Sequence, residues 1–175
     1  MNADVEFHLR KMAEQDLAQV LAWRNHEDVR RYMFGSGLIA MEQHQRWFAG
    51  ATLDSTRALL ILERDGVPSG FVNIKFDAQS RVGSWGFYVS PDAPRGTGKT
   101  MGQLALAYAF NYLGLHKLCG EVIAFNERSL RYHERLGFTE EGRLRDQYFD
   151  GTVYHHVISF GLLAGEWTTT STDEK

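Results

Sequence analysis

Cysteine is nearly absent from this sequence, and so are proline and long apolar runs. The 175 residues include one cysteine, Cys119, and three prolines. A single cysteine excludes an internal disulfide framework and a cysteine-based metal site. No stretch approaches the length of a membrane span, and the first ten residues contain no apolar signal core. We therefore expect a cytoplasmic protein that uses neither a metal nor a membrane.

A strong charge of either sign is also lacking. The 19 basic and 22 acidic residues leave a formal charge of -3, which gives no electrostatic case for nucleic acid or an anionic membrane as a partner. A composition of 43% hydrophobic residues suits one globular domain. We predict a single domain over residues 1–167 and a polar, disordered tail over 168–175. A homodimer is left open.

The segment 91–101, PDAPRGTGKTM, contains two glycines and two basic residues, and it leads directly into an apolar segment with helical spacing. Glycine lets the backbone approach a ligand closely, and the amides of a first helical turn attract an anion. The segment therefore predicts a phosphate-binding loop. The residues expected to form it are Arg95, Gly96, Thr97, Gly98, Lys99 and Thr100.

Two known phosphate-binding motifs fit this loop, each with one mismatch. The P-loop of nucleoside triphosphatases begins with glycine, where this sequence has Ala93. The spacing Arg95-x-x-Gly98-x-Thr100 resembles the coenzyme A pyrophosphate loop of the GNAT family of N-acetyltransferases, which ends in glycine or alanine. The loop lies past mid-chain, and the next apolar segment ends in Asn126 instead of the aspartate that a P-loop protein needs. This context favours the acetyltransferase motif.

A second signature follows in the order expected for that family. The segment 126–138, NERSLRYHERLGF, is very similar to the GNAT pattern Asn-x-x-(Ala/Ser)-x-x-x-Tyr-x-x-x-Gly-Phe, with His133 in the tyrosine position. The resemblance implies the GNAT fold, an α+β architecture in three layers. Its mixed, mostly antiparallel sheet has about seven strands and helices on both faces. The resemblance also implies acetyl-CoA as cosubstrate and acetyl transfer to an amine.

Hydrophobic periodicity gives an outline that agrees with this fold. Helical spacing predicts helices over 14–24, 41–49, 101–113 and 127–136. The dipeptides at 65–66 and 150–151, both Asp-Gly, favour tight hairpin turns. Apolar strands are predicted over 7–10, 59–63, 71–76, 84–89, 117–125, 142–149 and 153–163.

The resemblance implies contacts with the coenzyme beyond the loop. Tyr88 and Val89 end the strand before it and are expected to offer backbone groups to the pantetheine arm. Asn126, Ser129 and His133 share one helix face by their spacing. Asn126 is expected to bind the pantetheine arm, although it is equally suited to cap the helix. His133 is expected to protonate the departing thiolate, with a purely structural role as the alternative.

A second catalytic candidate is Glu121, which lies mid-strand among apolar neighbours. An acidic residue in that setting is either a rim residue or a base acting through water. The resemblance favours the base, with Asn73 helping to hold the water.

A narrower resemblance concerns the acceptor. The segments 23–26 (WRNH), 38–44 (LIAMEQH), 108–110 (YAF), 117–122 (KLCGEV) and 141–143 (EGR) are similar to GNAT enzymes of pseudaminic acid biosynthesis. Those enzymes acetylate the 4-amine of a UDP-linked 4-amino-4,6-dideoxysugar, which implies a nucleotide-sugar substrate attacked without an acyl-enzyme. The candidate partners of its diphosphate, uracil and sugar are Arg24, Asn25, Arg30, Met33, His44, Trp47, Lys75, Trp85 and Tyr88.

Two alternatives stay open. The first is an N-acetyltransferase that acts on a protein amino terminus or a polyamine, the latter favoured by a strongly acidic cleft. The second is a non-catalytic acetyl-CoA-binding or interaction module, because Thr100 and His133 depart from the two signatures. Turnover of any amine with acetyl-CoA would exclude that second alternative.

Overall fold

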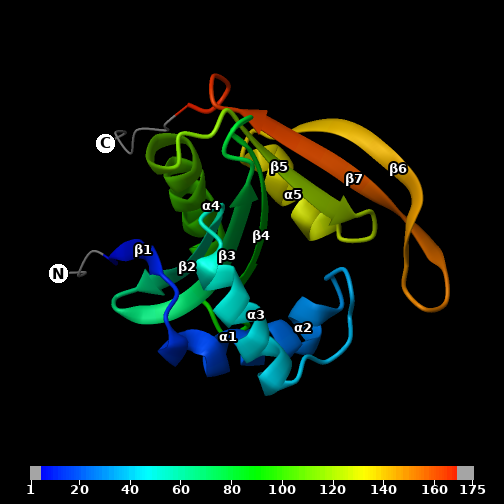
Figure 1. The fold of residues 1–175 in the computed structure, drawn as a ribbon. Coiled ribbons are helices and arrows are strands. Elements are labelled where there is room, and N and C mark those ends of the chain that lie inside the picture. The colour runs from blue at the N-terminus through cyan, green and yellow to red at the C-terminus, as the bar shows by residue number, and fades with distance from the viewer. Residues whose placement is uncertain (1–4, 169–175) are drawn as a thin grey trace.

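The structure is a computed structural model that describes residues 5–168. It contains a seven-stranded sheet in the order β1-β2-β3-β4-β5-β7-β6 (Figure 1). The β4–β5 pair is parallel and the other neighbouring pairs are antiparallel, so the predicted mixed sheet is confirmed. The strands are β1 (Phe7–Lys11), β2 (Arg57–Arg64), β3 (Val67–Phe76), β4 (Val82–Val89), β5 (Lys117–Ile123), β6 (Thr139–Phe149) and β7 (Tyr154–Leu163).

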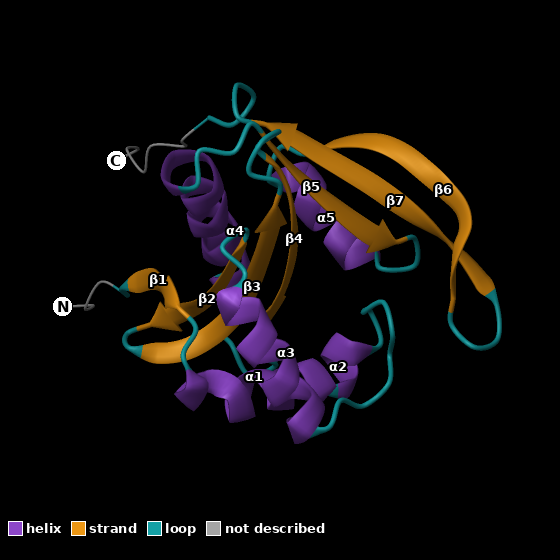
Figure 2. Ribbon diagram, in the orientation of Figure 1, coloured by secondary structure: helices purple, strands orange, loops and turns teal. Residues whose placement is uncertain are grey.

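Helices cover both faces of the sheet, as Figure 2 shows. Helix α4 packs on one face next to α5, whereas α1 and α3 pack on the other. A short 3-10 helix (Glu14–Asp16) precedes α1, and a π-helical turn (Tyr108–Tyr112) ends α4. The α-helices are α1 (Leu17–Asn25), α2 (Glu27–Arg30), α3 (Met41–Leu53), α4 (Thr97–Ala107) and α5 (Glu127–Arg135).

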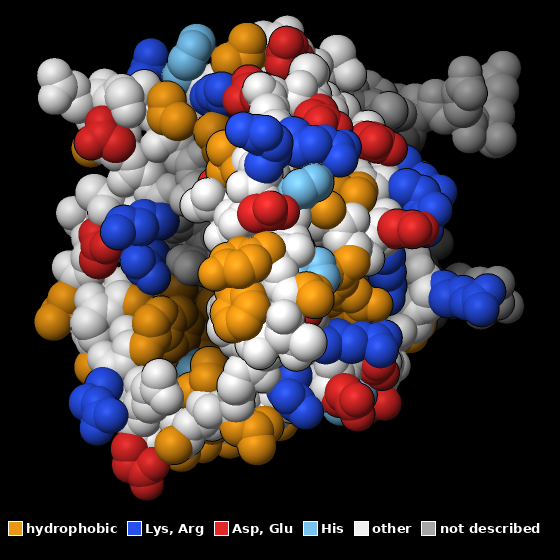
Figure 3. All heavy atoms as spheres, turned by 90° about the vertical axis from the view of Figure 1, so that its right-hand side faces the viewer, with side chains coloured by type: hydrophobic (Ala, Val, Ile, Leu, Met, Phe, Trp, Pro, Cys, Tyr) orange, Lys and Arg blue, Asp and Glu red, His pale blue; other side chains and the backbone are white. Residues whose placement is uncertain are grey.

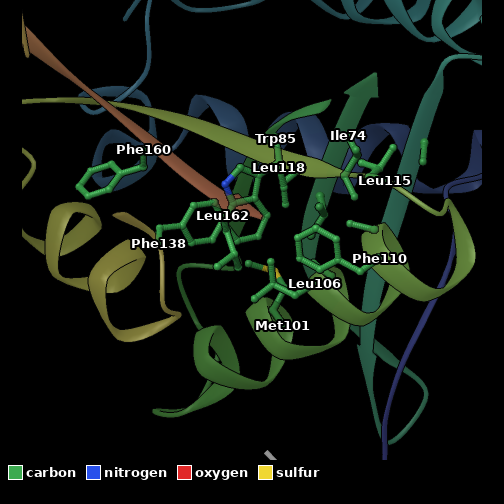
Figure 4. Packing of buried hydrophobic residues seen from close by; sticks show 14 of the residues in the cluster. Ile74, Trp85, Met101, Leu106, Phe110, Leu115, Leu118, Phe138, Phe160 and Leu162 are labelled. Carbon is green, nitrogen blue, oxygen red and sulfur yellow. The ribbon is translucent and has the colours of Figure 1, made fainter. Parts of the chain in front are cut away.

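Strand β2 shows why the sheet needs two helical layers. Successive side chains of a strand point to opposite faces. Leu60 and Leu62 join the core under α4, which Figure 4 shows from close by, whereas Leu59 and Ile61 join the core under α1 and α3. All four side chains are buried. A strand that is apolar on both faces is stable only when both faces are covered.

The predicted elements are present, with shifts at their ends. The hairpin between β2 and β3 turns at Asp65 and Gly66, whose φ angles of 51° and 77° are those of a tight turn. Helix α4 begins at Thr97, four residues before the predicted start, so the phosphate loop leads directly into it. Helix α2 was not predicted, because four residues are too few to show a helical period.

The predicted disordered tail lies outside the described residues, apart from Thr168. Within residues 5–168, no helix is both long and apolar enough to cross a membrane.

Candidate active site

Strands β4 and β5 diverge after a short paired stretch. Residues Val82–Ser84 pair with Lys117–Cys119, and beyond this point β4 continues to Val89 without pairing to β5. Figure 1 shows the two strands separating. Backbone N–H and C=O groups on the facing edges therefore need another hydrogen-bonding partner. The divergence opens the sheet to an extended ligand, beside the predicted contact residues Tyr88 and Val89.

The phosphate loop follows β4 directly. Gly96 adopts the left-handed conformation, with φ 93°, immediately before α4 begins, which explains the glycine. The Thr97 hydroxyl donates to the Pro94 carbonyl at 2.8 Å and closes the turn. The amides of Gly98 and Lys99 fall in the first helical turn, where no acceptor exists within the helix. Amides in this position can hydrogen-bond an anion, and their contact with the pyrophosphate stays a prediction.

The other loop residues divide into two kinds. Arg95 and Lys99 are exposed, so both can place their charge next to a bound phosphate. The Thr100 amide instead donates to the Gly96 carbonyl at 3.2 Å and starts the helical ladder. The Thr100 amide therefore has a partner within the protein, whereas those of Gly98 and Lys99 remain candidates for the anion.

Two residues that hold the loop were missed by the sequence analysis. The Tyr132 hydroxyl donates to the Gly98 carbonyl at 2.7 Å and so ties α5 to the first turn of α4. Burial raises the pKa of Tyr132, which keeps this donor protonated. A Cβ atom on Gly102 would lie 2.5 Å from the Tyr132 hydroxyl oxygen and 2.8 Å from Leu136. Because Gly102 has no side chain, α4 and α5 can approach each other closely here. A glycine within the apolar run 101–113 was the sequence signal that could have indicated this close contact.

Asn126 caps helix α5. Its side-chain oxygen accepts a hydrogen bond from the Ser129 amide at 3.1 Å. The side-chain NH2 group takes no part in that bond. The capping alternative is therefore realised, and the predicted contact of Asn126 with the pantetheine arm stays compatible with it.

His133 is buried in an aromatic cluster, with 2% of its surface exposed. The Trp85 indole nitrogen donates to Nε2 of His133 at 3.2 Å. Nδ1 of His133 lies 2.8 Å from the Ser129 carbonyl oxygen and donates to it. Burial also lowers the pKa of the imidazole, which favours the neutral form. The predicted role of His133 as a general acid is inconsistent with this geometry, because neither nitrogen is free to protonate a thiolate.

Glu121 is exposed on β5, beyond the point at which β4 and β5 separate. It pairs with Ser159 in the β5–β7 register and has no ion-pair partner within residues 5–168. Asn73 lies on β3, and its side-chain oxygen is buried without a partner in the described part of the chain. Strand β4 lies between the two residues. Their joint action through a water stays a prediction.

The loop between α2 and α3, residues 31–40, is fastened by residues that the sequence analysis assigned to substrate. Asn25 makes two hydrogen bonds to the backbone of Ile39, donating to its carbonyl at 2.8 Å and accepting from its amide at 2.9 Å. Arg24 donates to the Gly35 carbonyl at 2.8 Å, and Arg30 donates to a further loop carbonyl at 3.1 Å. All three side chains therefore hold the loop, and their predicted contacts with a diphosphate stay predictions.

Aromatic side chains of the loop 31–40 contact residues on and next to β5 and β6. The Tyr32 ring lies 6.1 Å from the ring of Phe125, just past β5. The Phe34 ring meets the Tyr148 ring edge-on at 5.6 Å, and the Tyr148 hydroxyl lies 3.5 Å from the backbone carbonyl of Met33. We call Tyr32, Phe34, Phe125 and Tyr148 the aromatic rim. Figure 3 shows this side of the molecule with hydrophobic and basic side chains around a hollow.

Four other predicted acceptor residues are placed differently from expectation. His44 is buried and stacks on Trp47 at 5.1 Å between ring centroids, and both pack with the core under α1 and α3. Trp85 belongs to the core on the opposite face. Lys75 is exposed on β3, paired in register with Ser84 where the sheet is still closed. His44 and Trp85 are therefore buried, whereas Trp47 is half-buried against the core.

Comparisons with known proteins agree on the family. A family model described as an acetyltransferase (GNAT) domain matches residues 6–139. Spermidine N(1)-acetyltransferase of Escherichia coli is 27% identical over 86% of this chain and 82% of that protein. Acetyltransferase PseH of Campylobacter jejuni is 26% identical over 79% of this chain and 86% of that protein. A match of 35% identity to the SPbeta prophage-derived uncharacterized N-acetyltransferase YokL of Bacillus subtilis spans about half of each protein, 53% and 54%.

Among solved structures, spermidine N-acetyltransferase from Vibrio cholerae in complex with CoA and spermine superimposes with a TM-score of 0.86. The match covers 91% of this chain and 96% of that chain at 22% identity, which shows a shared fold. The fold excludes the P-loop interpretation, because the loop follows an antiparallel hairpin strand and not the first strand of a parallel sheet. With the family model matching most of its length, the chain is an N-acetyltransferase of the GNAT family.

Proposed function

We propose that this enzyme transfers the acetyl group of acetyl-CoA to a primary amine of a polyamine such as spermidine. The observation that carries this choice is the exposed carboxylate of Glu121, which lies beside the opening between β4 and β5 and has no ion-pair partner in the described residues. An unpaired carboxylate attracts an ammonium group and repels a diphosphate. The polyamine acceptor takes the place of the nucleotide sugar that the narrower resemblance implied.

The basic side chains proposed for a diphosphate support the same choice. Arg24 and Arg30 already donate to loop carbonyls, and His44 is a buried residue of α3. The aromatic rim adds flat apolar surface and exposed ring faces at Phe34 and Phe125. Ring faces attract alkylammonium groups. The similarity to spermidine acetyltransferases points to the same class of acceptor.

The chemistry requires a neutral amine. An alkyl ammonium group titrates near pH 10, so almost all of the amine is protonated at pH 7. We assign Glu121 to accept this proton through a water molecule, which frees the nitrogen lone pair to attack the thioester carbonyl. The tetrahedral intermediate then loses its second nitrogen proton to solvent and its C–S bond breaks, and the leaving thiolate takes up a proton from solvent, since both nitrogens of His133 are engaged. The amides of Gly98 and Lys99 hold the pyrophosphate throughout.

A UDP-linked aminosugar is the second candidate acceptor, and one observation favours it. Nη1 of Arg24 is buried without a partner in the described residues, although Nη2 holds the loop. A phosphate or sugar oxygen would satisfy that donor. The similarity to PseH supports the same candidate.

Rates of acetylation measured with alternative substrates distinguish the polyamine from the UDP-linked aminosugar. Release of free CoA is measured with spermidine, a UDP-4-amino-4,6-dideoxysugar and a peptide with a free amino terminus. We expect kcat/KM for spermidine to exceed the others by about tenfold or more, since a single well-placed charged contact contributes about 1.5–3 kcal/mol. Faster turnover of the nucleotide sugar would replace the polyamine with that acceptor, and the absence of turnover with any amine would remove the catalytic assignment.

A second prediction concerns the fastened loop. Replacing Asn25 with alanine removes both hydrogen bonds to Ile39, each contributing about 1 kcal/mol. The KM for the acceptor amine should rise by about tenfold, while the Kd for acetyl-CoA should stay unchanged, because the phosphate loop lies on another element. Gln45→Ala, an exposed change on α3, is the matched control. An unchanged acceptor KM in a folded Asn25→Ala variant would separate this loop from the acceptor site.

A further inference from the structure

His133 lies at the position where the sheet opens. The last pair of the parallel ladder is Ser84 with Cys119, so Trp85 and Gly120 are the first residues beyond it. The His133 ring touches both of them. Its Nε2 accepts from the Trp85 indole at 3.2 Å, and a Cβ atom on Gly120 would lie only 2.5 Å from the same nitrogen.

The protonation state of His133 follows from its partners. An indole N–H can only donate, so Nε2 must carry the lone pair and Nδ1 the proton. Nδ1 then donates to the Ser129 carbonyl, one turn back along α5. The rest of the ring is enclosed by aromatic groups, stacking on Phe160 at 5.0 Å and meeting Phe138 edge-on at 5.1 Å. The imidazole is thereby fixed in position as well as in charge.

Gly120 explains why histidine replaces the tyrosine of the signature at this position. The imidazole already occupies the space that a Cβ atom on Gly120 would need, and such an atom would also lie 3.0 Å from the Trp85 indole nitrogen. A phenol reaches farther than an imidazole, so a tyrosine at position 133 would collide with β5 or push it away. Histidine and glycine are a matched pair across α5 and β5.

We propose that His133 is a positioning residue that sets the separation of β4 and β5 where the pantetheine arm enters. It acts as a spacer between Trp85 of β4, Gly120 of β5 and helix α5, and it contacts no reacting atom. The proposal rests on the family's use of acetyl-CoA and adds to it the group that fixes the width of the opening. A side chain that spaces the strands affects coenzyme affinity, whereas a general acid affects the chemical step.

The test compares His133→Ala, His133→Gln and Gly120→Ala. Removing the ring or crowding it from β5 should each raise the KM and Kd for acetyl-CoA by about tenfold or more, because a cavity or an overpacked contact lets the strands beside the opening shift. Glutamine places an oxygen near the position of Nε2, accepts from Trp85, and should recover most of the affinity. Loss of kcat to the same extent in the alanine and glutamine variants would overturn the proposal in favour of acid catalysis.

The double variant Gly120→Ala/His133→Ala completes a double-mutant cycle, which measures whether the two residues act together on coenzyme affinity. The added methyl group then occupies space that the ring has left, so the two changes should combine to much less than the product of their separate effects. Independent effects, or wild-type affinity in both folded single variants, would overturn the proposal. If His133→Ala does not fold, Gly120→Ala and His133→Gln decide the question. Calorimetry of the wild-type protein with acetyl-CoA is the reference: no binding there would refute the coenzyme assignment itself.

Discussion

Replacing Gly102 with alanine is expected to weaken acetyl-CoA binding by about tenfold or more. The new methyl group would lie 2.5 Å from the Tyr132 hydroxyl oxygen, so either α4 or α5 must shift. Overpacking of this kind costs about 1–3 kcal/mol. The Tyr132 hydroxyl donates to the Gly98 carbonyl, so a shift of α5 displaces the turn whose amides we propose to hold the pyrophosphate. Calorimetric titration with acetyl-CoA measures the effect.

Gly50→Ala provides the matched control for this change. Gly50 lies in helix α3, and a Cβ atom there would meet nothing within 4 Å. Alanine in an open helical position gains up to about 1 kcal/mol of stability over glycine. Coenzyme affinity should be unchanged and the Tm slightly higher. In the double variant Gly102→Ala/Tyr132→Phe the colliding oxygen is gone, and part of the lost affinity should return; no return would show that Tyr132 does not transmit the effect.

Local sequence signals predicted the framework of the coenzyme site. The glycines of segment 91–101 predicted a loop that leads into a helix, and the structure places Gly96, with its φ of 93°, immediately before α4. The amides of Gly98 and Lys99 follow from the start of a helix, which is a local property. The apolar run at 59–62 predicted a strand, and the structure adds that this strand is buried on both faces. Contacts within a few residues were therefore accessible from the sequence.

The sequence did not reveal which polar side chains face a cleft and which make hydrogen bonds to other parts of the chain. Asn25 and Ile39 are far apart in the chain, so their paired hydrogen bonds could not be foreseen. His133 was assigned from its place in a signature, whereas its role depends on Trp85 and Gly120, which come from other elements. Hydrogen bonds between residues of different elements satisfy polar side-chain atoms that, from the sequence alone, look available to bind a ligand. This is why the acceptor residues needed more correction than the coenzyme residues.

Replacing Glu121 with glutamine is expected to lower kcat by about 10²-fold at pH 7, within the range for loss of a general base. Glutamine keeps the size of the side chain but cannot accept the amine proton. Because more of the amine is already neutral at higher pH, the deficit should shrink as the pH rises from 7 to 9. The Kd for acetyl-CoA should not change, since the phosphate loop is intact.

Glu127→Gln tests whether this effect belongs to the position of Glu121 and not to acidic charge in general. Glu127 is exposed on α5 and lies 3.4 Å from Arg131 in a surface ion pair, which contributes little to stability. Its replacement should leave kcat and both KM values unchanged. A Glu121→Gln variant with wild-type kcat and a raised KM for spermidine would show that the carboxylate binds the ammonium without deprotonating it. Wild-type values for both parameters would place the polyamine elsewhere and remove the observation on which that acceptor was chosen.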